Sequence, residues 1–162
     1  MAPSTNKPGK QGSVAVIQKV RGSVNHVASL FEDVEKVPSW HPALHSLVRS
    51  KKRGVGVGST QEFKARIRGR EAAGTFEATV WEPGKLYAWK GTEAVSGVSY
   101  EVLYALTPLG DVATEVKATL SYEIPDDIAP LVLIEGSDEL ARRTLEEILR
   151  QLDLEASSLV KR

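Results

Sequence analysis

Much of this chain alternates between apolar and polar residues with a period of two, the spacing of a β-strand with one covered face. The clearest runs lie at 59–68, 76–80, 98–106 and 115–123, and shorter apolar runs lie at 14–20, 44–52 and 86–90. Glycine and proline mark the turns between them, at 54–58, 82–85 and 108–111. The pattern predicts an antiparallel sheet of about six or seven strands that is wet on one face.

Two segments follow a helical spacing instead. Ser23 is placed to cap a helix with apolar residues at 27, 30, 31 and 34, which should end before Pro38. A longer helix is predicted near the end of the chain, with Ser137 as its N-cap and acidic residues in its first turn. Its apolar stripe comprises Leu140, Ala141, Thr144, Leu145, Ile148, Leu152, Ala156 and Leu159. About twenty helical residues span roughly 30 Å, enough to lie across a sheet and leave a cavity beneath.

Two connecting segments are less regular. Residues 38–42 form a loop bracketed by two prolines. Residues 124–134 contain prolines, two aspartates and a short apolar run, which suits either a short helical turn or the mouth of a pocket. Both interpretations of this second segment stay open at this point.

The composition is that of a single globular domain. At 162 residues the chain can bury a full core, and it has no run of about 18 apolar residues that would span a membrane. Residues 1–12 are rich in Pro, Ser, Lys and Gly without an apolar stretch, so we expect a disordered tail rather than a secretory signal. Cysteine is absent, which excludes disulfides, thiol nucleophiles and thiolate metal sites. We expect a cytoplasmic location.

Charge is balanced overall but unevenly spread. Residues 1–70 hold 13 lysines and arginines against 4 acidic residues, and residues 71–162 hold 8 against 17. The basic residues can simply solvate two adjacent strands, or they can present a cationic face to an anionic membrane surface. That face would comprise Lys51, Lys52, Arg53, Lys64, Arg66 and Arg68. No exposed aromatics are interleaved for base stacking, so no nucleic-acid partner is expected.

Trp40, His41 and His45 are the densest cluster of residues capable of chemistry. Either histidine could act as a general base or bond a ligand at a pocket rim, because histidine titrates near neutral pH. Alternatively, the tryptophan anchors the loop and both histidines are surface residues. No third ligand stands at a suitable spacing, so neither a metal site nor a cofactor is expected.

Aromatic residues of the predicted sheet fall on both alternations. Tyr100, Tyr104 and Tyr122 fall on the covered face, where a buried hydroxyl needs a partner. They indicate a cavity with polar points, or a core whose hydroxyls reach the rim. Trp81 and Trp89 fall on the alternation opposite to Phe76, Val80 and Leu86, so they either pack against the first helix or stand exposed.

The order of elements and three short motifs resemble a known superfamily. The motifs are Trp-x-Pro at 40–42, Trp-Glu-Pro-Gly-x-Leu at 81–86 and Thr-Glu-Val at 114–116. Over residues 13–160 the chain resembles the START-like (SRPBCC) helix-grip superfamily, in its polyketide cyclase/dehydrase and lipid-transport branch. The resemblance implies an α+β fold with two short helices after the first strand, and a curved sheet that grips the last helix around a ligand cavity.

In such a domain the covered face would line the cavity. The predicted ligand-binding residues are Tyr100, Tyr104, Tyr122, Phe63, Ile67, Phe76, Val102, Val116, Leu120, Trp40 and His45, with Leu145, Ile148 and Leu152 of the last helix as a lid. For most of these, ordinary core packing is the alternative.

Three functions are compatible with this cavity. The first is binding or transport of a hydrophobic small molecule, such as a lipid, an isoprenoid or an aromatic polyketide. The second is a cyclase/dehydrase-type enzyme, with Tyr104, Tyr122 and His45 as candidate acids or bases, although no activating partner is visible for any of them. The third is a regulatory domain that binds a partner protein through its charged faces.

Overall fold

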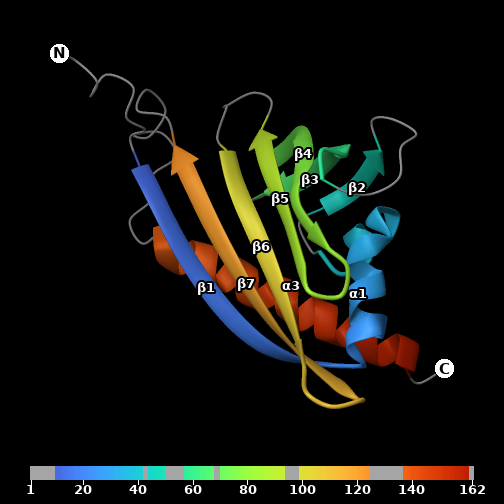
Figure 1. Ribbon diagram of the computed structural model, residues 1–162. Helices are drawn as coiled ribbons and strands as arrows, with labels where there is room; N and C mark the ends of the chain where they lie inside the picture. The colour runs from blue at the N-terminus through green and yellow to red at the C-terminus, as the bar shows by residue number, and fades with distance from the viewer. Residues whose placement is uncertain are drawn as a thin grey trace.

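The computed structural model describes residues 10–41, 44–49, 57–67, 70–93, 99–124 and 137–160. Seven strands, two α-helices and one 3-10 helix make up these residues (Figure 1). In chain order they are β1 (Lys10–Arg21), α1 (Val24–Glu32), η2 (Val34–Ser39), β2 (Leu44–Arg49), β3 (Thr60–Ile67), β4 (Arg70–Glu82), β5 (Leu86–Glu93), β6 (Ser99–Pro108), β7 (Ala113–Ile124) and α3 (Ser137–Val160). No helix in this part of the chain is long and apolar enough to cross a membrane.

The strands form one antiparallel sheet in the order β1-β7-β6-β5-β4-β3-β2. Strands β2 to β7 follow one another as a meander, and β1 joins the far edge beside β7. Turn glycines with positive φ, Gly84 (77°) and Gly110 (89°), allow the tight returns between β4 and β5 and between β6 and β7. The predicted fold class, a curved antiparallel sheet with two short helices after the first strand and a long C-terminal helix, is confirmed.

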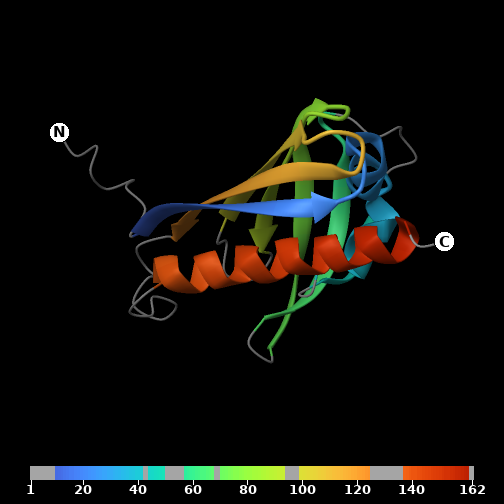
Figure 2. The same cartoon turned by 90° about the horizontal axis from the view of Figure 1, so that it is seen from below.

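Helix α3 lies along β1 on the covered face, and its C-terminal end reaches α1 (Figures 1 and 2). The stripe that it buries comprises Leu145, Ile148, Leu149, Leu152 and Ala156. Two details of the predicted stripe were wrong: Thr144 is exposed, and Leu149 is buried. Each residue advances about 100° around a helix, so Thr144 lies about 100° from Leu145, at the edge of the stripe. The side chains of Leu140, Ala141 and Leu159 lie outside the described residues.

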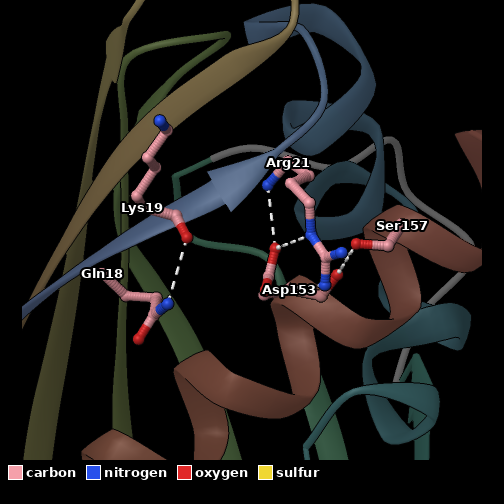
Figure 3. A network of polar contacts seen from close by, with 5 residues as sticks. All are labelled: Gln18, Lys19, Arg21, Asp153 and Ser157. Carbon is pink, nitrogen blue, oxygen red and sulfur yellow. Dashed lines mark hydrogen bonds and ion pairs between the residues drawn. The ribbon is translucent and has the colours of Figure 1, made fainter.

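Polar groups of α3 bind the free edge of β1 (Figure 3). The Asp153 carboxylate accepts hydrogen bonds from the backbone N–H of Arg21 (2.9 Å) and from its guanidinium Nε and Nη2 (3.3 and 3.1 Å). Arg142 donates to the Ala15 carbonyl (3.4 Å), and Gln18 donates to the neighbouring Lys19 carbonyl (3.0 Å). An edge strand presents unpaired backbone groups that invite another strand. Here side chains satisfy several of them, which also fixes the helix along β1.

Two predicted boundaries near the N-terminus need correction. Strand β1 begins at Lys10, inside the tail predicted for residues 1–12, because Lys10, Gln11 and Gly12 pair in register with the end of β7. Residues 1–9 lie outside the described part. The chain at Pro38 is not a loop, since this proline lies within η2, which is closed by the Trp40 N–H donating to the Val37 carbonyl at 3.1 Å.

Candidate ligand-binding site

The covered face of the sheet is built from rows of residues that the strand register aligns across β1, β7, β6 and β5. The rows are Gly12–Tyr122–Tyr100–Gly91, then Val14–Leu120–Val102–Trp89, then Val16–Ala118–Tyr104–Tyr87. In the first row, a Cβ on Gly91 would lie 2.7 Å from both the Tyr100 and the Phe76 ring. Glycine at that position therefore leaves room for two aromatic rings to lie against the sheet.

A β-bulge places a tryptophan where the alternation did not predict it. The β4–β5 register shifts between Ala78 and Val80, so the side chains beyond the bulge change faces. Trp81 consequently pairs with Tyr87 and contacts its ring edge-on, with centroids 4.8 Å apart. The expectation that Val80 shares the face of Phe76 was wrong for this reason.

The prediction for β5 placed the wrong residues on the covered face. Tyr87 and Trp89, rather than Leu86, face the core, since their partners across the strand are Tyr104 and Val102. Tyr87 is fully buried and Trp89 is 8% exposed. Trp89 also stacks near Phe31 of α1, at 6.4 Å and 19°, so the alternative in which it packs against the first helix was the right one.

An aromatic cluster joins α1 and η2 to the sheet. It consists of Phe31, Trp40, Trp81, Tyr87, Trp89 and Tyr104, with centroid separations between 4.8 and 6.4 Å. Phe31 is its centre: it stacks on Tyr87 at 5.3 Å and 7° and meets Tyr104 at 4.9 Å. The Tyr87 hydroxyl donates to Glu32 and accepts from the Gly84 N–H, which ties α1 to the β4–β5 turn. Part of the space under the sheet is therefore filled by packed rings.

Next to this cluster lies a small inner pocket of about 40 Å³. A buried water needs a space of about 10–15 Å³, so this pocket has room for about three waters. Its described lining is apolar and mostly aromatic: Val37, Trp40, His41, Leu44, Phe76, Trp89, Tyr100, Val102 and Tyr104. The pocket thus lies between the η2 segment and the middle of the sheet.

A wider outer hollow of about 600 Å³ lies towards the end of the same strands. Its described lining is more polar and comes from both faces of the sheet. Gly12, Tyr100 and Tyr122 belong to the covered face, whereas Ser13, Lys90, Ser99, Glu101 and Ser121 belong to the opposite face. The volume falls within the range of about 300–1,000 Å³ typical of small-molecule sites. Among the described residues, Tyr100 alone lines both spaces, and it is half-buried.

Two residues that line the inner pocket each have a buried polar atom without a hydrogen-bond partner, namely His41 Nδ1 and Trp89 Nε1. By contrast, the indole of Trp40 donates to the Leu30 carbonyl at 3.0 Å. Such unpaired groups are rare in folded proteins, because each costs about 1–3 kcal/mol. One further unpaired atom in the described part, Gln61 Oε1, is buried on β3 and does not line this pocket.

Burial also sets the ionisation of the pocket. Desolvation lowers the pKa of His41 to about 4, against a smaller opposing effect of a backbone hydrogen bond, so its ring is neutral at pH 7. Desolvation raises the pKa of Tyr104, and the nearby Tyr100 adds to the increase, so its phenol stays protonated. The described lining of the inner pocket therefore carries no charge at neutral pH.

The structure brings together only part of the predicted site. Trp40, Phe76, Tyr100, Val102 and Tyr104 line the inner pocket, and Tyr122 lines the outer hollow. Phe63, Val116, Leu120, Leu145, Ile148 and Leu152 belong to the core but line neither space. Helix α3, which carries Leu145, Ile148 and Leu152, packs mainly against β1 and β7, and the role of these residues as a lid stays a prediction. The side chains of His45 and Ile67 lie outside the described residues.

Four lining residues were missing from the predicted set: Val37, His41, Leu44 and Trp89. His41 adjoins Trp40 in the sequence and was the other histidine considered. The face of β5 that carries Trp89 and the position of η2 under the sheet depend on pairing between segments that are far apart in the chain. No local sequence pattern predicts either of them.

The predicted cationic face is described only at Lys64, whose side chain is exposed. Lys51, Lys52, Arg53 and Arg68, and the side chain of Arg66, lie outside the described residues. Membrane binding through this face stays a prediction. Within the described part of the chain, no cluster of three or more His, Asp or Glu side chains is placed to hold a metal ion.

These features define the class of protein: a helix-grip domain with an aromatic pocket between its short helices and its sheet. The family of polyketide cyclase/dehydrase and lipid-transport proteins matches residues 11–156, and the chain belongs to that family. It is a family of START-like domains that bind hydrophobic ligands. No functionally curated protein matches the sequence.

Solved structures share this fold at low identity. A START superfamily protein from Mycobacterium smegmatis has a TM-score of 0.78 at 20% identity, over 91% of this chain and 98% of that one. The ZhuI aromatase/cyclase from Streptomyces sp. R1128 has a TM-score of 0.75 at 15% identity, over 93% and 96%. Ginseng major latex-like protein 151 from Panax ginseng has a TM-score of 0.71 at 14% identity, over 90% and 97%. At these identities the likeness extends to the fold alone.

Proposed function

We propose that this protein binds a hydrophobic small molecule, whose apolar part enters the inner pocket past Tyr100 while the remainder occupies the outer hollow. The observation that carries the proposal is the inner pocket itself, which has an uncharged, mostly aromatic lining and two buried polar atoms without partners. A pocket that served only as core would be expected to satisfy those atoms internally.

The inner pocket must enlarge to accept a ligand, because about 40 Å³ is far below the size of typical sites. Tyr100 is the side chain best placed to move. Its ring is half-buried and contacts Phe76 edge-on at 6.0 Å, and it borders the outer hollow of about 600 Å³. Burying about 200 Å² of ligand surface contributes about 5 kcal/mol at roughly 25 cal/mol per Å², compared with about 1 kcal/mol for the ring contact between Tyr100 and Phe76.

Binding is favoured over cyclase/dehydrase catalysis by the state of His41. A general base works best when its pKa lies near the working pH, and burial lowers the pKa of His41 to about 4. Its Nδ1 has no hydrogen-bond partner, so no carboxylate bound there raises its basicity. Tyr104 stays protonated, so it can orient a ligand by donating a hydrogen bond but supplies no base.

The experiment compares two substitutions on neighbouring positions of β6. Val102→Phe would place a ring in the inner pocket, whereas Leu103→Phe adds the same ring to the opposite face of the strand. The probe is N-phenyl-1-naphthylamine, a neutral dye whose fluorescence rises in apolar surroundings. We expect the dye to bind the wild type and Leu103→Phe alike and to bind Val102→Phe at least tenfold more weakly.

Circular dichroism and thermal melting establish that both variants are folded. Failure of the wild type to bind the dye, or equal binding by Val102→Phe, would overturn the proposal.

A further inference from the structure

We propose that the pocket selects a neutral ligand carrying a hydrogen-bond acceptor, such as a ketone or ester carbonyl, which accepts from the indole N–H of Trp89. This inference rests on the proposed function and specifies the chemistry of the ligand.

The need for an acceptor follows from Trp89. This residue is 8% exposed and lines the inner pocket, and its Nε1 is buried without a hydrogen-bond partner. An indole N–H can only donate, so its missing partner must be an acceptor. The unpaired Nδ1 of His41 is less informative, because a neutral imidazole nitrogen donates or accepts according to its tautomer.

The need for neutrality follows from the rest of the lining. None of the nine described residues around the inner pocket is cationic, and His41 stays neutral near pH 7. A buried carboxylate without a counter-charge carries a large desolvation penalty. Lys90 follows Trp89 in β5 but points to the opposite face, where it is exposed, pairs in register with Glu101 and, with Glu101, lines the outer hollow. An anionic group would therefore stay in the outer hollow, away from Trp89.

Three ligands of nearly equal shape test the requirement for an acceptor separately from the requirement for a neutral charge. The ketone 2-acetonaphthone has the acceptor, the hydrocarbon 2-isopropenylnaphthalene has a methylene group in its place, and 2-naphthoate carries a negative charge at pH 7.5. For the wild type we expect the ketone to bind about tenfold more tightly than either of the others, the change expected when a buried donor gains its partner.

Trp89→Phe supplies the decisive comparison. It should reduce the preference for the ketone over the hydrocarbon from about tenfold to less than twofold, whatever change in apolar contact the two ligands share. A preference that persists in Trp89→Phe, or a naphthoate affinity equal to that of the ketone, would overturn the inference. If none of the three ligands nor the neutral dye binds the wild type, the proposed function fails instead.

A second measurement uses the wild type, so it does not depend on folding of the variant. In ¹⁵N–¹H spectra the indole signal of Trp89 should shift downfield when the ketone is added and stay nearly unchanged with the hydrocarbon. The indole of Trp40, which already donates to the Leu30 carbonyl, serves as an internal control. Equal shifts of the Trp89 signal with both ligands would contradict a carbonyl acceptor.

Discussion

Protonation of His41 should destabilise this protein well above the pH at which most carboxylates titrate. In the folded state its Nδ1 is buried without a partner, although the residue as a whole is only half-buried, and burial lowers its pKa from 6.5 to about 4. The unfolded chain therefore binds this proton more readily than the native state does. Stability consequently falls as the pH drops from 6.5 towards 4, and it is insensitive to this group above 7.

The magnitude follows from the two pKa values. Linkage of one proton with pKa 6.5 in the unfolded state and about 4 in the native state gives a loss of about 2 kcal/mol between pH 7 and pH 5. For a domain with a typical stability of about 5–15 kcal/mol, that is a large fraction of the total.

The assay is urea denaturation of the wild type and of His41→Phe at half-unit steps from pH 7.5 to pH 5. The variant keeps a ring in the pocket and removes the titrating group, so subtracting its curve cancels the contribution of other groups. We expect the wild type to lose about 2 kcal/mol relative to the variant over this range. If the difference in free energy of unfolding between the wild type and the variant changes by less than about 0.5 kcal/mol over this pH range, the assignment of a buried neutral imidazole is refuted.

Three further substitutions, one of them combined with Arg21→Gln in a double-mutant cycle, test the contacts that shape the domain. Asp153→Asn weakens three hydrogen bonds to Arg21 and should lower the free energy of unfolding by about 1–2 kcal/mol, and a double-mutant cycle with Arg21→Gln should recover most of that as coupling. Gly74→Ala should cost about 3 kcal/mol, because its Cβ would lie 2.1 Å from the Thr92 carbonyl oxygen and force two strands apart. Gly12→Ala should cost less, about 1 kcal/mol, because its Cβ meets the movable end of a tyrosine ring, and equal losses in thermal denaturation would contradict this reasoning.

Several parts of the site were predictable from local patterns. Tyr100, Val102 and Tyr104 alternate along β6, and their common face was predicted from that spacing. Trp40 was predicted from its cluster with His41 and His45, and Phe76 from the alternation in β4. Each of these positions depends only on residues close by in the chain.

The remaining parts depend on contacts between distant segments. Trp81 reaches the aromatic cluster because a bulge between Ala78 and Val80 shifts the strand by one residue. The apolar stripe of α3 was predicted, but its partner was not, since the same stripe can cover any apolar surface. In the structure Asp153 binds Arg21 at the edge of β1, which places the apolar stripe against that strand.

From the sequence alone, the period-two runs, the turn residues and the helical stripe determine that this chain forms an antiparallel sheet with a long terminal helix. Those features follow from the geometry of single elements, in which side chains alternate every two residues or return every three to four. Only the tertiary structure decided that aromatic rings fill part of the space beneath the sheet, and that His41 after η2 and Trp89 in β5 line the same inner pocket. Register, bulges and helix placement arise from pairing across long distances in the chain, which no local spacing encodes.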